Sequence, residues 1–153
     1  MIALTRSVVL AVAVGLAALT GAHSQSSKPH RIAIQVDQND PAVMNLALNN
    51  AENIIAYYRD KNEDVDVEIV AYGPGLNMLR ADTSPVKDRI ARMANADAIF
   101  PAKLAFSACN NTLQGMEKHE GHAIAIIPQA KIVPAGVVRL SELEEQGWSY
   151  IRP

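Results

Sequence analysis

The chain has 153 residues, with 14 lysines and arginines against 16 aspartates and glutamates, and a formal net charge of −2. The basic residues are scattered along the sequence, so we expect no binding to the phosphate backbone of a nucleic acid. Two phenylalanines and one tryptophan are too few for an aromatic platform on which bases stack.

The first 24 residues have the pattern of a secretory signal peptide. Arg6 is the only charged residue among them, and residues 8–19 are all apolar or glycine. This run matches the apolar segment of a signal peptide and is shorter than the ~20 residues of a membrane span. Ala22 and Ser24 have the spacing that signal peptidase recognises, so we expect cleavage after Ser24 and a periplasmic location. The alternative is an uncleaved N-terminal anchor.

The rest of the chain has the length of one domain. Residues 25–30 are expected to form a short polar linker, and residues 31–153 are long enough to build a hydrophobic core. Cys109 is the only cysteine, so an internal disulfide is excluded. Stability is then expected from packing and from association of several copies.

The first half of the domain alternates strand patterns with a helical one. A buried strand is expected at residues 31–36, followed by Asp40 as a helix cap and Pro41 at the first helical position. Apolar residues at helical spacing continue this helix to its charged end at Asp64. A second strand is expected at residues 65–71.

The second half continues the alternation with shorter segments. The expected elements are helices from Leu76 and Pro85, a strand at 104–108, a helix capped by Asn110 or Asn111, a sheet strand at 131–133, a helix near Val137 and a last strand at 148–151. Strands and helices that alternate at this spacing predict a three-layer α/β/α fold, with about five mainly parallel strands covered on both faces.

Chemistry is expected at the carboxyl ends of these strands, where open α/β sheets bind ligands. Four segments fall there: residues 37–40, 73–75, 109–111 and 134–136. Cys109 is the only strong nucleophile among them. Because it directly precedes a helix, free N–H groups and the helix dipole are expected to lower the pKa of its thiol. The alternative is an inert cysteine at a buried strand end, which is a common environment for this residue.

Motifs for other chemistries are incomplete. Gly73-Pro74-Gly75 lacks the third glycine of a dinucleotide-binding fingerprint and predicts a turn. His119, Glu120 and His122 lack the spacing of a zinc-protease helix, and no further ligand completes a metal shell. No Gly-x-Ser-x-Gly motif supports a serine hydrolase. We therefore expect no metal site and no dinucleotide-binding motif here.

Several motifs along residues 31–153 occur together in a characteristic order. They are residues 34–36 with Asp40-Pro41, and then residues 45–51, 68–75, 106–113, 133–137 and 146–153. In this order and spacing the chain resembles the DsrE/DsrF-like family of small sulfur-relay proteins, and most closely its exported, intracellular-sulfur-oxidation-like branch. One difference is the stretch 97–103, which is longer than the link that the family usually has before this strand.

The resemblance implies a five-stranded, mainly parallel sheet between helices, and assembly into a homotrimer or homohexamer. In the better understood members, the cysteine that matches Cys109 carries sulfur as a persulfide and passes it to a partner. The partner of this chain would be an exported sulfur donor or acceptor protein, or a small sulfur compound. The resemblance implies no metal and no organic cofactor.

A persulfide carrier needs a nucleophilic thiolate and hydrogen-bond donors beside the sulfur. With Cys109 as the carrier, the expected binding residues are Asn110, Asn111 and Thr112 through their N–H groups, with a side-chain bond from Asn111, and Asp37, Asn39 and Tyr72 as residues that line the pocket.

Two other interpretations remain open. The first is a non-catalytic module that binds a small ligand or a protein, in which the cysteine is structural. The sequence has few residues suited to catalysis, which favours this interpretation. A polar row of Asn45, Asn49 and Asn53 also favours it, because this row is expected to be solvated or to meet a neighbouring subunit. The second is thiol redox chemistry, in which any disulfide would be intermolecular because no resolving cysteine is present.

Overall fold

The computed structural model describes residues 28–96 and 103–153. The predicted signal peptide and most of the 97–103 stretch lie outside the described residues. Across the described part of the chain, no helix combines the length and the apolar character needed to cross a bilayer.

Five strands form one sheet in which every neighbouring pair is parallel, in the order β4-β3-β2-β1-β5. The strands are β1 (His30–Val36), β2 (Val65–Ala71), β3 (Lys103–Cys109), β4 (Ala130–Val133) and β5 (Ser149–Ile151). The helices are α1 (Pro41–Asp60), the 3₁₀ helix η1 (Gly73–Leu79), α2 (Lys87–Ala96), α3 (Asn110–Glu120) and α4 (Gly136–Glu145). This architecture confirms the predicted α/β fold, with a sheet that is wholly rather than mainly parallel.

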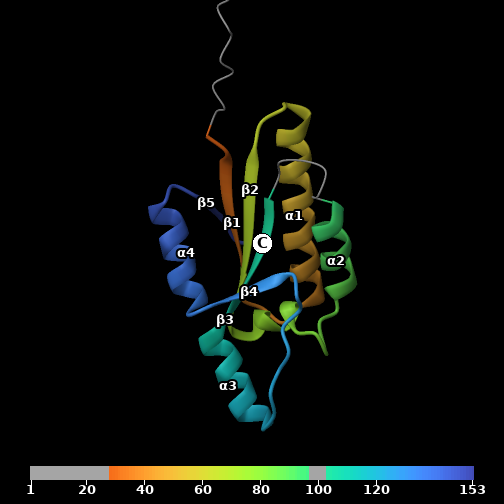
Figure 1. Ribbon diagram of the computed structural model, residues 1–153, viewed down its shortest axis with the longest axis vertical. Coiled ribbons are helices and arrows are strands. Elements are labelled where there is room, and N and C mark those ends of the chain that lie inside the picture. The colour runs from red at the N-terminus through yellow and green to blue at the C-terminus, as the bar shows by residue number, and fades with distance from the viewer. Residues whose placement is uncertain (1–27, 97–102) are drawn as a thin grey trace, which may run out of the picture.

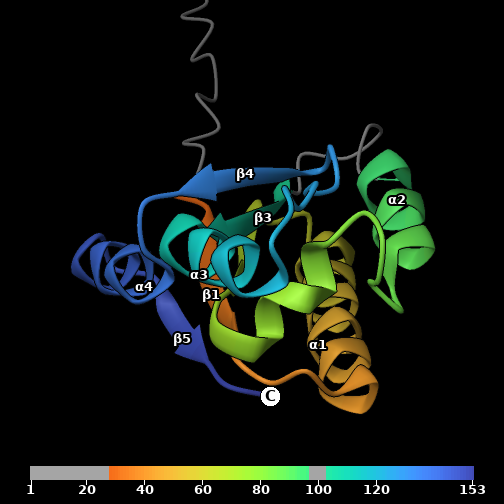
Figure 2. The same ribbon diagram turned by 90° about the horizontal axis from the view of Figure 1, so that it is seen from below.

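The helices cover both faces of the sheet. Figures 1 and 2 show α1 and α2 on one face and α4 on the other, while α3 and η1 lie at the carboxyl edge of the strands. All strands are parallel, so their carboxyl ends meet at this one edge. The segments that follow β1, β2, β3 and β4 are therefore brought together there.

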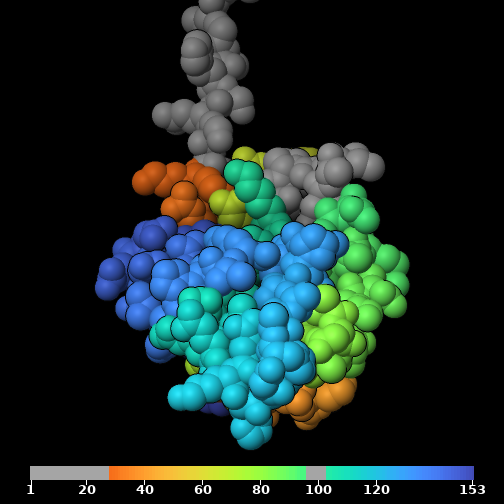
Figure 3. Space-filling model, turned by 60° about the horizontal axis from the view of Figure 1, so that its bottom comes forward, coloured from red at the N-terminus to blue at the C-terminus, as the bar shows by residue number. Residues whose placement is uncertain are grey.

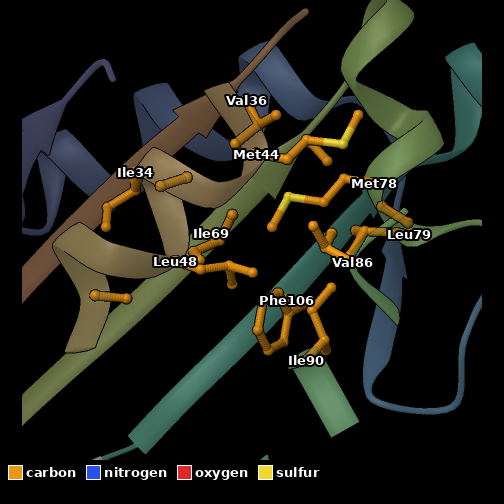
Figure 4. Close-up of a cluster of buried hydrophobic side chains, with 14 of the residues drawn as sticks. Ile34, Val36, Met44, Leu48, Ile69, Met78, Leu79, Val86, Ile90 and Phe106 are labelled. Carbon is orange, nitrogen blue, oxygen red and sulfur yellow. The ribbon is translucent and has the colours of Figure 1, made fainter. Parts of the chain in front are cut away.

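The two faces differ in character. Alternate residues of a strand point to opposite faces, and on β2 Val67 and Ile69 join the large apolar cluster beneath α1 and α2. Figure 4 shows this cluster, which includes Met44 of α1, Ile90 of α2 and Phe106 of β3. The cluster beneath α4 is much smaller and consists of Ala33, Val70, Leu140 and Leu143. The face beneath α4 therefore has room for polar residues.

Several element boundaries differ from the predictions by one residue or more. β1 begins at His30, a residue that we placed in the linker, and α1 ends at Asp60 rather than at Asp64. Helix α1 ends early because Asn62 adopts a left-handed conformation, with a φ of 56°. The segment from Gly73 to Leu79 is a 3₁₀ helix that includes the predicted turn. The capping of α1 is confirmed, since the Asp40 side chain accepts a hydrogen bond from Ala42 N at 2.7 Å.

Two asparagines of the predicted polar row bind a neighbouring helix of the same chain. Arg89 of α2 donates to Asn45 Oδ1 at 2.9 Å and to Asn49 Oδ1 at 2.7 Å. It also forms an ion pair of 2.7 Å with Glu52. These contacts join α1 to α2, so Asn45 and Asn49 have a partner within the domain.

Candidate functional site

Cys109 lies where β3 ends and α3 begins. Its backbone is extended, with φ −69° and ψ 115°, and the residue occupies the N-cap position of α3. Its Sγ accepts a hydrogen bond from Thr112 N at 3.5 Å, the bond that a serine or aspartate usually accepts at this position. The prediction that Asn110 or Asn111 caps this helix is wrong, because both residues already belong to its first turn.

The surroundings of Cys109 favour its thiolate. Burial by itself raises the pKa of the thiol, but the Thr112 hydroxyl and three backbone N–H groups more than offset this effect, so the pKa lies below its ordinary value. The N–H groups belong to Gly136, Thr112 and Asn111. We call Cys109 and these three residues the sulfur site.

The Thr112 hydroxyl is oriented by a third segment. Gly73 N, at the start of η1, donates to Thr112 Oγ1 at 2.9 Å. Because the oxygen accepts this bond, the hydroxyl proton is free to be donated to the sulfur. The turn after β2, the end of β3 and the first turn of α3 therefore act together on the thiol.

The first turn of α4 completes the sulfur site from the other side. Asn111 N donates to Pro134 O at 3.3 Å, which ties α3 to the link between β4 and α4. In Figure 3 the atoms of α3 and of the α4 segment lie directly against each other at this edge. Gly136 packs against Tyr72, and a Cβ atom placed on this glycine would lie 2.7 Å from Tyr72 Cβ. Two helix N-termini thus meet around one sulfur, and only 5% of Cys109 is exposed.

A second group of polar side chains, separate from the asparagines of α1, continues in a row from the sulfur site along the sheet edge. Tyr72 adjoins Gly136, and burial together with the nearby Asp37 carboxylate raises the pKa of its phenol. Asp37 accepts hydrogen bonds from Gln35 Nε2 at 2.8 Å and from Arg152 at 3.1 Å. Of the predicted pocket residues, Tyr72 therefore adjoins the sulfur site, and Asp37 lies one step further along this row.

Asn39 and the side chain of Asn111 have other environments. Asn39 Oδ1 accepts a hydrogen bond from Asn77 Nδ2 at 2.8 Å, so it joins the end of β1 to η1. The backbone N–H of Asn111 donates to Pro134 O and, from its place beside the sulfur, also lowers the pKa of the Cys109 thiol. The side chain of Asn111 is exposed and has no hydrogen-bond partner among residues 28–96 and 103–153, so the predicted side-chain bond to the sulfur is not present there.

A charged cluster beneath α4 was missed by the sequence analysis. Glu68 on β2 is 3% exposed and binds Arg139 of α4, Lys131 of β4 and Ser107 of β3. A signal for it existed: a parallel sheet covered on both faces buries its central strands on both sides, and β2 is such a strand. A carboxylate there must have buried partners.

Glu120 and His122 of the 119–122 segment belong to an ion-pair cluster around Arg80. Glu120 forms an ion pair with the buried Arg80, and His122 Nε2 lies 3.3 Å from Glu120 Oε2. Arg80 also binds Asp82 at 2.7 Å, so it fastens the end of α3 to the segment after η1. Among the described residues, no three histidine, cysteine, aspartate or glutamate side chains are grouped as metal ligands.

Comparisons with known proteins support the fold. No protein-family model matches this chain, and a search of curated proteins finds no match. Among solved structures, the chain is similar to the protein of unknown function MTH1491 from Methanobacterium thermoautotrophicum, with 28% identity and a TM-score of 0.67. The similarity covers 81% of this chain and 99% of that one. It supports the α/β architecture and supplies no activity.

Proposed function

We propose that this protein carries sulfur as a persulfide on Cys109. The observation that supports the proposal is the environment of the single cysteine: its Sγ accepts a hydrogen bond from Thr112 N at 3.5 Å, and the Thr112 hydroxyl and the nearby Gly136 and Asn111 N–H groups also lower the pKa of the thiol. Such donors stabilise a sulfur anion without giving or taking a proton. Among the described residues, no carboxylate or imidazole hydrogen-bonds to Sγ, so the site suits nucleophilic transfer better than acid–base chemistry.

The transfer needs no oxidant. The Cys109 thiolate attacks the outer sulfur of a donor persulfide, R–S–SH, and a new S–S bond forms while the donor S–S bond breaks. The electrons of the broken bond leave with the donor as the thiolate R–S⁻. The Cys109 sulfur is thereby oxidised and the donor sulfur is reduced by the same amount, so the step balances. An acceptor thiolate removes the outer sulfur by the same step in reverse. The N–H groups at the N-termini of α3 and α4 stabilise the anion before and after each transfer.

The proposal includes export and an exported partner. The pattern of residues 1–24 supports secretion to a periplasm, where the cytosolic reducing pool is absent. A persulfide there needs protection from oxidants, and the low exposure of Cys109 offers it. A donor or acceptor of sulfur, as a protein or a small compound, must then be present in the same compartment.

The proposal also includes assembly into a homotrimer or homohexamer. Three large apolar side chains near the β4 edge are exposed: Ile132 at 54%, Val137 at 64% and Val138 at 52%. Association would remove this apolar surface from water, and small domains without disulfides gain stability in this way. We expect light scattering of the purified protein at micromolar concentration to give the mass of a trimer or a hexamer. A clean monomer at that concentration would contradict the assembly.

Sulfur loading is tested by intact mass. The purified protein is incubated with a low-molecular-weight persulfide, such as glutathione persulfide, and is expected to gain one sulfur atom that a thiol reductant removes. Cys109→Ser removes the nucleophile with little change in volume and is expected to gain none. The proposal is overturned if the wild-type protein gains no reducible sulfur, or if Cys109→Ser gains as much.

The second candidate is a binding module with a structural cysteine. The burial of Cys109 favours it, and so do the polar side chains of Tyr72, Asp37 and Arg152 along the sheet edge. In this case the thiol of the folded protein would resist alkylating reagents, and Cys109→Ser would leave the cellular phenotype unchanged. A reactive thiol with a lowered pKa excludes this candidate.

A further inference from the structure

The centre of the sheet face beneath α4 is polar. The side chain of Glu68 is 3% exposed there, next to the fully buried Ser107 of β3. A buried carboxylate is strongly unfavourable unless each of its oxygens has partners. The Glu68 carboxylate accordingly has partners on three neighbouring elements: Ser107, Lys131 and Arg139.

Its contacts join β2 to β3, β4 and α4. Glu68 Oε1 accepts from Ser107 Oγ at 2.6 Å and from Arg139 Nε at 2.7 Å. Oε2 accepts from Arg139 Nη2 at 2.7 Å and from Lys131 Nζ at 3.3 Å. The guanidinium thus binds the carboxylate through two parallel hydrogen bonds, a geometry that fixes orientation as well as distance.

Arg139 belongs to the same helical turn as the glycine of the sulfur site. Arg139 N donates to Ala135 O at 2.9 Å, the first hydrogen bond of α4, and Gly136 lies within this turn. The buried apolar side chains that α4 packs against the sheet are those of Leu140 and Leu143. Both residues follow Arg139 in the chain. The placement of the first turn therefore depends on Arg139, on the contact of Gly136 with Tyr72 and on the bond from Asn111 N to Pro134 O just before the turn.

We propose that Glu68 and Arg139 are positioning residues of the sulfur site, which hold the first turn of α4 so that the Gly136 N–H stays beside the Cys109 sulfur. Neither residue touches the sulfur. Their effect passes through the backbone of α4. The use of this arrangement in sulfur transfer rests on the proposed function. The arrangement itself exists whether or not sulfur is transferred.

The sign of the effect separates positioning from direct electrostatics. The charged groups in the ion-pair cluster on the Cys109 side of the sheet are Glu68 on β2, Lys131 on β4, and Arg139 and Glu142 on α4. The register places Arg31, Asp66 and Lys103 on the same face, near the amino ends of the strands and further from the sulfur. Removing the negative charge of Glu68 would by itself favour the thiolate and lower the thiol pKa. Loss of the Gly136 N–H from the sulfur would raise it. A rise in Glu68→Ala therefore indicates that the donors around the sulfur have moved, and a rise in Arg139→Lys, which keeps the bond from Ser107 to Glu68, assigns the movement to α4.

The experiment measures the thiol pKa from the pH dependence of iodoacetamide alkylation in the full-length protein. Glu68→Ala is expected to raise the pKa by about one unit, the effect of losing one hydrogen bond to a charged sulfur. Arg139→Lys keeps the charge but not the two parallel bonds, and is expected to give a smaller rise. Arg89→Met breaks a comparable cluster on the opposite face and is expected to leave the thiol pKa unchanged.

The outcomes are distinct. An unchanged or lowered pKa in a folded Glu68→Ala protein overturns the positioning role, and so does an equal rise in Arg89→Met. If circular dichroism shows that Glu68→Ala does not fold, Glu68→Gln replaces it, with the same volume, one acceptor oxygen and the same expected sign. Sulfur loading of the wild-type protein is scored separately, so failure of the proposed function leaves the pKa result interpretable.

Discussion

Replacing Gly75 by alanine is expected to lower the free energy of unfolding by at least about 3 kcal/mol. A Cβ atom at this position would lie 2.3 Å from Val36 O, 2.6 Å from Val36 C and 2.8 Å from Asp37 N. All three are backbone atoms, so no side chain can turn aside to make room. Val36 O also accepts the hydrogen bond of Tyr72 N at 3.1 Å, which the new methyl group would disturb.

The strand that would have to move is held on both sides. β1 lies between β2 and β5 in the sheet and is paired with both. Moving its carboxyl end would also disturb the residues after β2, where Gly73 donates to the Thr112 hydroxyl. The strain therefore cannot be relieved locally, and we expect it to appear as lost stability and as a less ordered sulfur site.

The measurements are urea denaturation, which gives the free energy of unfolding, and thermal unfolding, which gives the melting temperature, both followed by circular dichroism. Gly75→Ala is expected to lower the melting temperature by about 10 °C or more for a domain of this size. Gly115→Ala is the matched control, because Gly115 is an exposed residue of α3 with no atom within 4 Å of a built Cβ. That variant is expected to stabilise the protein by up to about 1 kcal/mol. A loss below 1 kcal/mol for Gly75→Ala would contradict the close approach.

The fold could be predicted because its signals are local and repeated. Apolar residues at positions 32, 34 and 36 and again at 65, 67 and 69 follow the strand period, and Asp40-Pro41 begins a helix between them. The sheet strand at 131–133 is confirmed as part of β4, although residues 124–127 are just as apolar. The choice depends on which segment reaches β3, a contact that the sequence alone does not display.

The details of the site were harder to predict because they depend on groups that pattern rules overlook. The rule for helix caps favours asparagine, yet a thiol occupies the N-cap position of α3. Cys109 was expected at a strand end before a helix, and it lies there. The contribution of Gly136 comes from its backbone, and that of Glu68 comes through α4. Neither can be read from the identity of the side chains near position 109.

Replacing Gly136 by alanine is expected to raise the pKa of the Cys109 thiol by about one unit and to lower stability by about 1–3 kcal/mol. The added Cβ would lie 2.7 Å from Tyr72 Cβ and 3.1 Å from Tyr72 Cγ. Tyr72 follows a central strand of the sheet, so the first turn of α4 is the part that moves. Its N–H then leaves the sulfur, and one of the donors that lower the thiol pKa is lost.

A double-variant cycle separates this displacement from other effects of alanine. Tyr72→Gly removes the Cβ atom that the new methyl group meets, so the Gly136→Ala/Tyr72→Gly protein is expected to have a thiol pKa close to that of Tyr72→Gly alone. The pKa is measured by the pH dependence of alkylation, and folding is checked by circular dichroism. At neutral pH the Gly136→Ala thiol is expected to react several-fold more slowly than the wild-type thiol, because the thiolate fraction falls as the pKa rises. Equal thiol pKa values for Gly136→Ala and the wild-type protein would show that the N-terminus of α3 alone holds the thiolate.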